Sequence, residues 1–117
     1  MSRSATVALF AAVAAVSGSL LPDPQQLVKD EAALGKYTAC LLGGDTCEPW
    51  TEEAKRYIPS ALKEGCKDCP QEHKNFYRVV TIHLKQNQPE VYNALAKHYD
   101  KDGVYEKKVL EFVYDTN

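Results

Sequence analysis

The chain has 117 residues, of which 44% are hydrophobic, 26% charged and 9% aromatic, and this composition is typical of a globular protein rather than of a disordered or collagen-like one. At this length we expect a single domain. The 14 lysines and arginines and 16 acidic residues give a formal charge of −2, without the clustered basic face that follows a phosphate backbone. Nucleic acid is therefore not an expected partner.

Residues 1–19 differ from the rest of the chain and predict a secretory signal peptide. Arg3 supplies a positive charge, residues 5–16 are apolar except for Thr6, and small residues follow at 17–19. A twelve-residue helix spans about 18 Å, too short for the ~30 Å hydrocarbon core of a bilayer. This favours a cleaved signal over a retained membrane anchor. We expect cleavage between about residues 17 and 20, and a secreted domain over residues 20–117.

Four cysteines, Cys40, Cys47, Cys66 and Cys69, occur in a short chain predicted to enter an oxidising compartment. They predict two disulfides, and their positions alone leave all three connectivities open. A zinc site is disfavoured because only one pair has the spacing of a zinc knuckle and no histidine lies at a ligand spacing beside the other pair. A redox Cys-x-x-Cys site is disfavoured because no parallel-sheet pattern surrounds it. We expect no metal, no cofactor and no catalytic residue.

The first half of the predicted mature chain contains two helical segments. Apolar residues recur at helical spacing over residues 24–42, which predicts one helix, or two short helices if Asp30 and Gly35 interrupt it. Thr51 is a candidate N-cap for the next segment. Pro59 must kink or break that segment.

Three further helical segments follow. One opens at Pro70, stops at residues 87–89 and carries an apolar side; another begins at Pro89 and ends at a turn over residues 100–103; the last covers residues 104–114. The fold class is therefore predicted to be all-α, a compact bundle of five to six short helices. The apolar positions of the first two of these segments are Phe76, Val79, Val80, His83 and Leu84, and then Tyr92, Leu95, Ala96 and Tyr99.

Motifs for chemistry fail on inspection, so the chain is not predicted to be an enzyme. Residues 100–103 look like part of a calcium loop, but its first and last ligands would be His98 and Val109, which cannot serve. His83 and His98 are expected in structural or surface roles. Several tyrosines fall on apolar helical faces, where they either line a pocket for an amphipathic ligand or simply pack the core. These tyrosines are Tyr37, Tyr57, Tyr92 and Tyr99.

The spacing Cys40-x6-Cys47-x18-Cys66-x2-Cys69, with the segments around it, carries a more specific signal. Tyr-Thr-Ala-Cys-Leu-Leu at 37–42, Ile-Pro-Ser-Ala-Leu at 58–62, Asn-Gln-Pro-Glu at 87–90 and Tyr-Asp-Lys-Asp-Gly-Val-Tyr at 99–105 are similar to the anchors of one family. This family is that of the arthropod chemosensory proteins, also called OS-D-like proteins. The resemblance covers about residues 27–108.

The resemblance implies helices around a hydrophobic channel and pairing of neighbouring cysteines, Cys40 with Cys47 and Cys66 with Cys69. It also implies a secreted carrier that binds small hydrophobic ligands such as fatty acids, long-chain alcohols, esters and semiochemicals. By match, the residues that would line the channel are Tyr37 and Tyr92, with Ala54, Ile58, Phe76, Val80 and Tyr105 as further wall positions. Four others, Leu41, Leu62, Val79 and Leu84, belong either to the wall or to the core.

Two departures from the family pattern change the expectation in detail. Tyr92 stands where the family usually has Trp, and its added hydroxyl favours ligands with polar heads. Only residues 20–26 lie between the expected cleavage and the first helix, so we expect a more open channel mouth. The alternative function is a secreted structural or signalling protein that acts through protein contacts; a thiol oxidoreductase is a third. We expect a monomer, and any membrane receptor is unknown from the sequence.

Overall fold

The computed structural model describes residues 21–45 and 47–115, and these ranges contain α-helices and no strand. The predicted signal peptide lies outside the described residues. The all-α prediction is confirmed. Helix α2 is a single turn, and the six longer helices match the expected number. The helices are α2 (Pro24–Leu27), α3 (Glu31–Leu41), α4 (Pro49–Lys55), α5 (Ile58–Glu64), α6 (Gln71–Asn87), α7 (Pro89–Tyr99) and α8 (Glu106–Tyr114). None of these described helices is long and apolar enough to cross a membrane.

The first predicted segment forms two helices because Asp30 starts a new one. The Asp30 carboxylate accepts a hydrogen bond from the Ala33 N–H at 3.1 Å, which satisfies a donor that would otherwise lack a partner in the first turn of α3. Asp23 does the same for α2 through the Gln25 N–H at 3.0 Å. Gly35 lies inside α3 and does not interrupt it.

The second segment also differs in detail from its prediction. Thr51 is not an N-cap; α4 begins at Pro49, because proline suits the first turn, where its missing N–H is not needed. Thr51 instead lies inside α4 with its side chain buried. Pro59 breaks the segment as predicted: α4 ends at Lys55, and Pro59 lies in the first turn of α5.

Two disulfides join neighbouring cysteines, Cys40 with Cys47 and Cys66 with Cys69, as the resemblance implied. The first ring spans seven positions and joins the end of α3 to the loop before α4. The second spans three positions between α5 and α6. Gly65 prepares the second ring, because its φ of +63° ends α5 in the left-handed region and lets the Cys66 N–H return to the Ser60 carbonyl at 3.0 Å. Each ring is therefore local.

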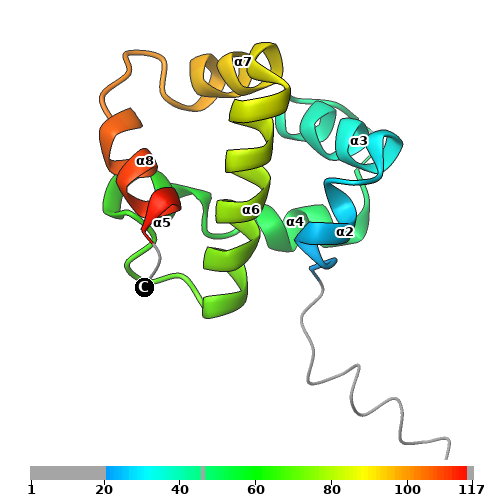
Figure 1. Ribbon diagram of the computed structural model, residues 1–117, viewed down its shortest axis with the longest axis horizontal. Helices are drawn as coiled ribbons and strands as arrows, with labels where there is room; N and C mark the ends of the chain where they lie inside the picture. The colour runs from blue at the N-terminus through cyan, green and yellow to red at the C-terminus, as the bar shows by residue number, and fades with distance from the viewer. Residues whose placement is uncertain (1–20, 46, 116–117) are drawn as a thin grey trace, which may run out of the picture.

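Helix α6 runs through the middle of the molecule (Figure 1). It packs against α2, α7 and α8, while α8 also packs on α5, and α3 contacts α2, α4 and α7. The buried side chains of α6 follow a helical period that faces these neighbours. They are His73, Phe76, Tyr77, Val80 and Leu84, whereas the predicted inward positions Val79 and His83 are only half-buried.

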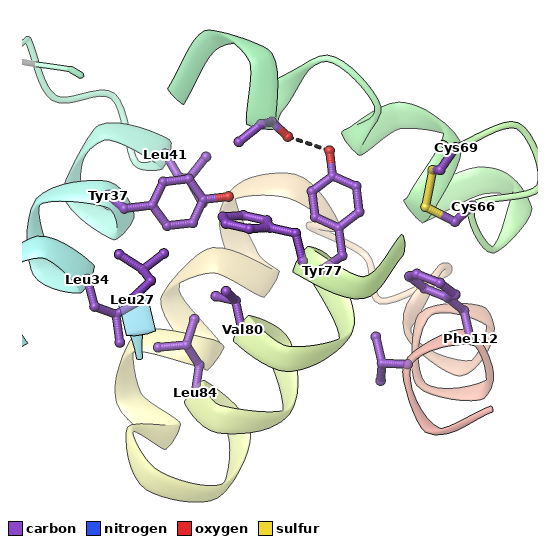
Figure 2. Close-up of a cluster of buried hydrophobic side chains, with 13 residues drawn as sticks. Leu27, Leu34, Tyr37, Leu41, Cys66, Cys69, Tyr77, Val80, Leu84 and Phe112 are labelled. Atoms are coloured by element: carbon purple, nitrogen blue, oxygen red, sulfur yellow. Dashed lines mark hydrogen bonds between the residues drawn. A yellow bond between two sulfur atoms is a disulfide. The ribbon is translucent and has the colours of Figure 1, made fainter. Parts of the chain in front are cut away.

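Three aromatic rings fix α3 and α4 against α6. The Tyr37 ring centroid lies 5.1 Å from that of Trp50 and 5.6 Å from that of Phe76, and the last two centroids are 6.1 Å apart. Edge and tilted arrangements of this kind stabilise a core by about 0.5–1.5 kcal/mol per pair beyond simple burial. Figure 2 shows this core from Leu27 on the side of α3 to Phe112 on α8. Helices α3 and α4 are thus packed tightly against α6.

Candidate functional site

An apolar cavity of about 150 Å³ lies among α6, α7 and α8 and is closed by residues of α3 and α5. Its wall is mostly hydrocarbon, and the exceptions are tyrosine hydroxyls, Thr81 and the carboxylates of Asp100 and Glu106. Helices α6 and α7 supply much of it through Tyr77, Val80, Thr81, Leu84, Leu95 and Ala96. Leu41, Ile58, Ala61, Leu62, Val109 and Phe112 close the space from α3, α5 and α8.

The inner face of α7 shows the effect of this space on burial. Tyr92, Leu95, Ala96 and Tyr99 recur at the spacing of one helix face and all line the cavity, yet no residue of α7 is fully buried. Residues of this type at this spacing normally pack into a core. They stay half-buried here because they face open space rather than a neighbouring helix.

Four of the seven channel residues that the resemblance named line this cavity, and three do not. Tyr37, Ile58, Val80 and Tyr92 are wall residues. Phe76 and Ala54 are fully buried beside the cavity, because aromatic rings cover Phe76 and the Tyr77 side chain holds the Ala54 carbonyl. Tyr105 is the N-cap of α8 and is not a wall residue. Of the residues left undecided, Leu41, Leu62 and Leu84 line the cavity and Val79 does not.

Three tyrosine hydroxyls of the wall connect pairs of helices. The Tyr99 hydroxyl donates to the Leu41 carbonyl at 2.8 Å and so joins α7 to α3. The Tyr92 hydroxyl donates to the Glu106 carboxylate at 3.2 Å, across the gap between α7 and α8. The Tyr77 hydroxyl donates to the Ala54 carbonyl and joins α6 to α4, as the dashed line in Figure 2 shows. The wall is therefore held partly by its own polar groups.

Tyr37 is the fourth tyrosine of the wall, and its hydroxyl makes no hydrogen bond with the described residues. Its side chain is 4% exposed, and its hydroxyl points away from α3 toward the side of α6 that carries Tyr77 (Figure 2). A hydroxyl on the cavity wall without a protein partner can donate to an acceptor in the cavity. Tyr37 thus offers a donor to whatever fills the cavity.

The four wall tyrosines are protonated at neutral pH, and burial moves the pKa of each further above that range. Desolvation raises the pKa of each of them, and it raises that of Tyr92 to about 12 with the Glu106 carboxylate as a second cause. We call these four residues, Tyr37, Tyr77, Tyr92 and Tyr99, the cavity tyrosines. All four hydroxyls are therefore neutral donors under physiological conditions.

The lip of the cavity lies where α7 ends and α8 begins. Glu106 is exposed and lies within hydrogen-bond distance of Tyr92, and Asp100 accepts the Tyr105 N–H through both carboxylate oxygens at 3.1 Å. Both acids line the cavity. The ammonium of Lys85 lies 4.8 Å from the centre of the Tyr92 ring, on the outer side of the wall. No group of three potential metal-ligating side chains occurs in the described ranges.

Sequence reasoning did not assign Tyr77, Thr81, Leu95 or Ala96 to the channel wall. Tyr77 and Thr81 share a helix face with Val80, and Leu95 and Ala96 share one with Tyr92, so periodicity would have added them. The two acids at the lip carried no such signal. Asp100 follows the end of α7 and Glu106 begins α8, and charged residues at such positions normally face solvent.

The described residues form an all-α fold with two local disulfide rings and an apolar cavity, and the comparisons assign the family of the chain. The family described as "Insect pheromone-binding family, A10/OS-D" matches residues 22–107, and the chain belongs to it. This confirms the resemblance found in the sequence.

Curated relatives and one solved structure agree with this assignment. "Allergen Tha p 1" of Thaumetopoea pityocampa is 31% identical over 86 residues, which cover 74% of this chain and 68% of that protein. "Ejaculatory bulb-specific protein 3" of Drosophila melanogaster is 30% identical over the same shares of both chains. The solved antennal chemosensory protein A6 of the moth Mamestra brassicae superimposes with a TM-score of 0.66 at 28% identity, over 79% of this chain and 90% of that one.

Proposed function

We propose that this chain is a secreted carrier of small hydrophobic ligands such as long-chain alcohols, esters or fatty acids. The observation that carries the proposal is the apolar cavity among α6, α7 and α8. Membership of a pheromone-binding family supports it, and so does the similarity to a moth chemosensory protein.

Burial of hydrocarbon supplies the binding free energy in such a site, at about 0.8 kcal/mol for each methylene group removed from water. The cavity volume of about 150 Å³ is close to that of an engineered cavity that takes up benzene, and it is smaller than the roughly 300–1,000 Å³ typical of small-molecule sites. A long chain therefore either extends through the lip or moves the wall helices apart. Affinity should rise with chain length until this adjustment becomes too costly.

The arrangement of the wall helices favours such an adjustment. Helices α7 and α8 both pack on α6 but hardly on each other, and the Tyr92–Glu106 hydrogen bond connects them. Both disulfide rings lie before α6, so neither ties α7 or α8 to the rest of the fold. A ligand can thus enter at the lip without breaking a covalent link.

Native mass spectrometry of the disulfide-bonded protein, titrated with alcohols, esters and acids of ten to eighteen carbons, tests the proposal. We expect 1:1 complexes whose survival in competition peaks at one chain length. The variant Ala96→Phe places a ring in the cavity and should shift that peak to shorter chains, whereas Ala32→Phe on the exposed surface of α3 should leave it unchanged.

A protein that retains no ligand at any length would contradict the carrier function. It would favour the alternative, a secreted structural or signalling protein that acts through protein contacts. Secretion is tested separately by the amino-terminal sequence of the protein recovered from the medium of a eukaryotic host. We expect it to begin at residues 18–20, and retention of residue 1 would contradict a cleaved signal.

A further inference from the structure

The charges around the cavity are unequal in sign. Asp100 and Glu106 line it, and none of its described wall residues carries a positive charge. Both acids belong to the lip, so a polar head that stays near solvent while its tail enters the cavity meets them first. The hydrocarbon wall contacts the tail of the ligand, and these two carboxylates contact its head.

Hydrogen-bonding capacity at the lip is mostly that of acceptors. Asp100 uses both oxygens on the Tyr105 N–H, and one Glu106 oxygen accepts from Tyr92. The other Glu106 oxygen makes no hydrogen bond with the described residues. A hydroxyl head can donate to it, whereas an ionised carboxylate has no proton to donate and adds a like charge.

The opposite orientation, with the head inside, does not help a carboxylate. The inner polar groups are the neutral hydroxyls of Tyr37 and Thr81, together with the Tyr77 and Tyr99 hydroxyls, which already donate to protein carbonyls. An ionised head buried there loses its hydration without meeting an opposite charge, which is strongly unfavourable. An alcohol or a carbonyl head can accept from Tyr37 at a much smaller cost.

Lys85 is a cation that contacts a residue of the cavity wall. Its ammonium rests on the face of the Tyr92 ring, 4.8 Å from the ring centre, and Lys85 does not line the cavity. Lys85 therefore does not reverse the sign of the lip.

We propose that the cavity selects neutral amphiphiles with a hydroxyl head over carboxylates of the same chain length, and that Glu106 is the specificity-determining residue. The inference rests on the proposed carrier function and names the ligand class of that same site. We expect the alcohol to bind at least about tenfold more tightly than the matched acid at neutral pH, a difference of about 1.4 kcal/mol.

The test compares dodecan-1-ol with dodecanoate, each displacing one neutral fluorescent probe from the full, disulfide-bonded protein below its micellar range. The variant Glu106→Gln keeps an acceptor for the Tyr92 hydroxyl but removes the charge. It should bind dodecanoate several-fold more tightly and reduce the preference for the alcohol. Lys85→Gln is the matched control and should leave the preference unchanged, with circular dichroism used to verify that both variants keep their helix content.

Equal affinities of the parent protein for alcohol and acid would overturn the inference while the carrier function stands. Tighter binding of dodecanoate than of dodecan-1-ol, weakened by Lys85→Gln, would overturn it as well. That result would assign the contact with the head group to Lys85. Failure of both ligands, and of the probe, would instead refute the carrier function itself.

Discussion

Tyr99→Phe removes one hydroxyl and with it the hydrogen bond that joins α7 to α3. The acceptor is the carbonyl of Leu41, the last residue of α3, which has no partner within its own helix. A neutral hydrogen bond contributes about 1 kcal/mol net. Because Tyr99 is only half-buried, water can reach the carbonyl in the variant, and the loss should stay near this value. At about 4 to 8 °C per kcal/mol for a domain of this size, we expect the Tm to fall by about 4 to 8 °C.

Two companion variants calibrate this number. Tyr77→Phe leaves the Ala54 carbonyl without its partner where Ala54 is 0% and Tyr77 8% exposed, so the loss should reach about 1–3 kcal/mol. Tyr114 is 48% exposed, and Tyr114→Phe should change the free energy of unfolding by less than about 0.5 kcal/mol.

Thermal and urea unfolding, followed by circular dichroism with both disulfides intact, measure the loss of stability in each variant. We expect the largest loss for Tyr77→Phe, a smaller one for Tyr99→Phe and the smallest for Tyr114→Phe. A Tyr99→Phe variant as stable as Tyr114→Phe would refute the reasoning, because α7 would then be held in place without its link to α3.

Three further predictions concern the disulfides, the cavity tyrosines and Tyr92. Reduction of the two short rings should cost about 2 to 2.5 kcal/mol of stability each by chain entropy. It should lower the Tm more than the ligand affinity, since no cysteine lines the cavity. Calorimetry and ligand titration on oxidised and reduced protein compare the two effects, and an equal loss of stability and of affinity would contradict this prediction. Raising the pH above 10 should destabilise the fold: the folded-state pKa values of the cavity tyrosines exceed the ordinary value of 10.0, reaching about 12 for Tyr92, so their contribution is complete below pH 10 and is lost as the pH rises through the folded-state values. Urea unfolding at increasing pH, with tyrosine ionisation followed by ultraviolet absorbance, measures this loss of stability. Ordinary titration of all 7 tyrosines in the folded protein would contradict the prediction. Tyr92→Ala should weaken ligand binding about tenfold, or about 1.4 kcal/mol, with helix content unchanged, and an affinity equal to that of the parent would remove Tyr92 from the site.

The helices could be predicted from sequence because local chemistry places most of their ends. Pro89 and the Asp30 cap act on the residues next to them, so their effect does not depend on the rest of the fold. Thr51 shows where this fails: it has the chemistry of an N-cap, but Pro49 starts the helix earlier and carries Thr51 into the interior.

The cavity wall was harder to predict than the helices because periodicity identifies an inward face without saying what that face meets. Phe76 and Val80 are one turn apart on the same face of α6, yet Phe76 lies under the rings of Tyr37 and Trp50 while Val80 borders open space. The difference is set by how far the neighbouring helices stand from α6. Glu106 was missed for a related reason, since only the packing of α8 on α6 places the start of that helix at the lip.

The placement of both disulfide rings before α6 has a consequence for how the protein opens. Residues 71–115 contain no cross-link, and α7 is held by its packing on α6 and α3 and by two tyrosine hydroxyls. Segments held this way open locally at a smaller free energy than the whole domain. Amide hydrogens of α7 should therefore exchange with solvent faster than those of α3 and α6. A bound ligand should slow their exchange first, so the exchange rate of α7 reports whether the cavity is occupied.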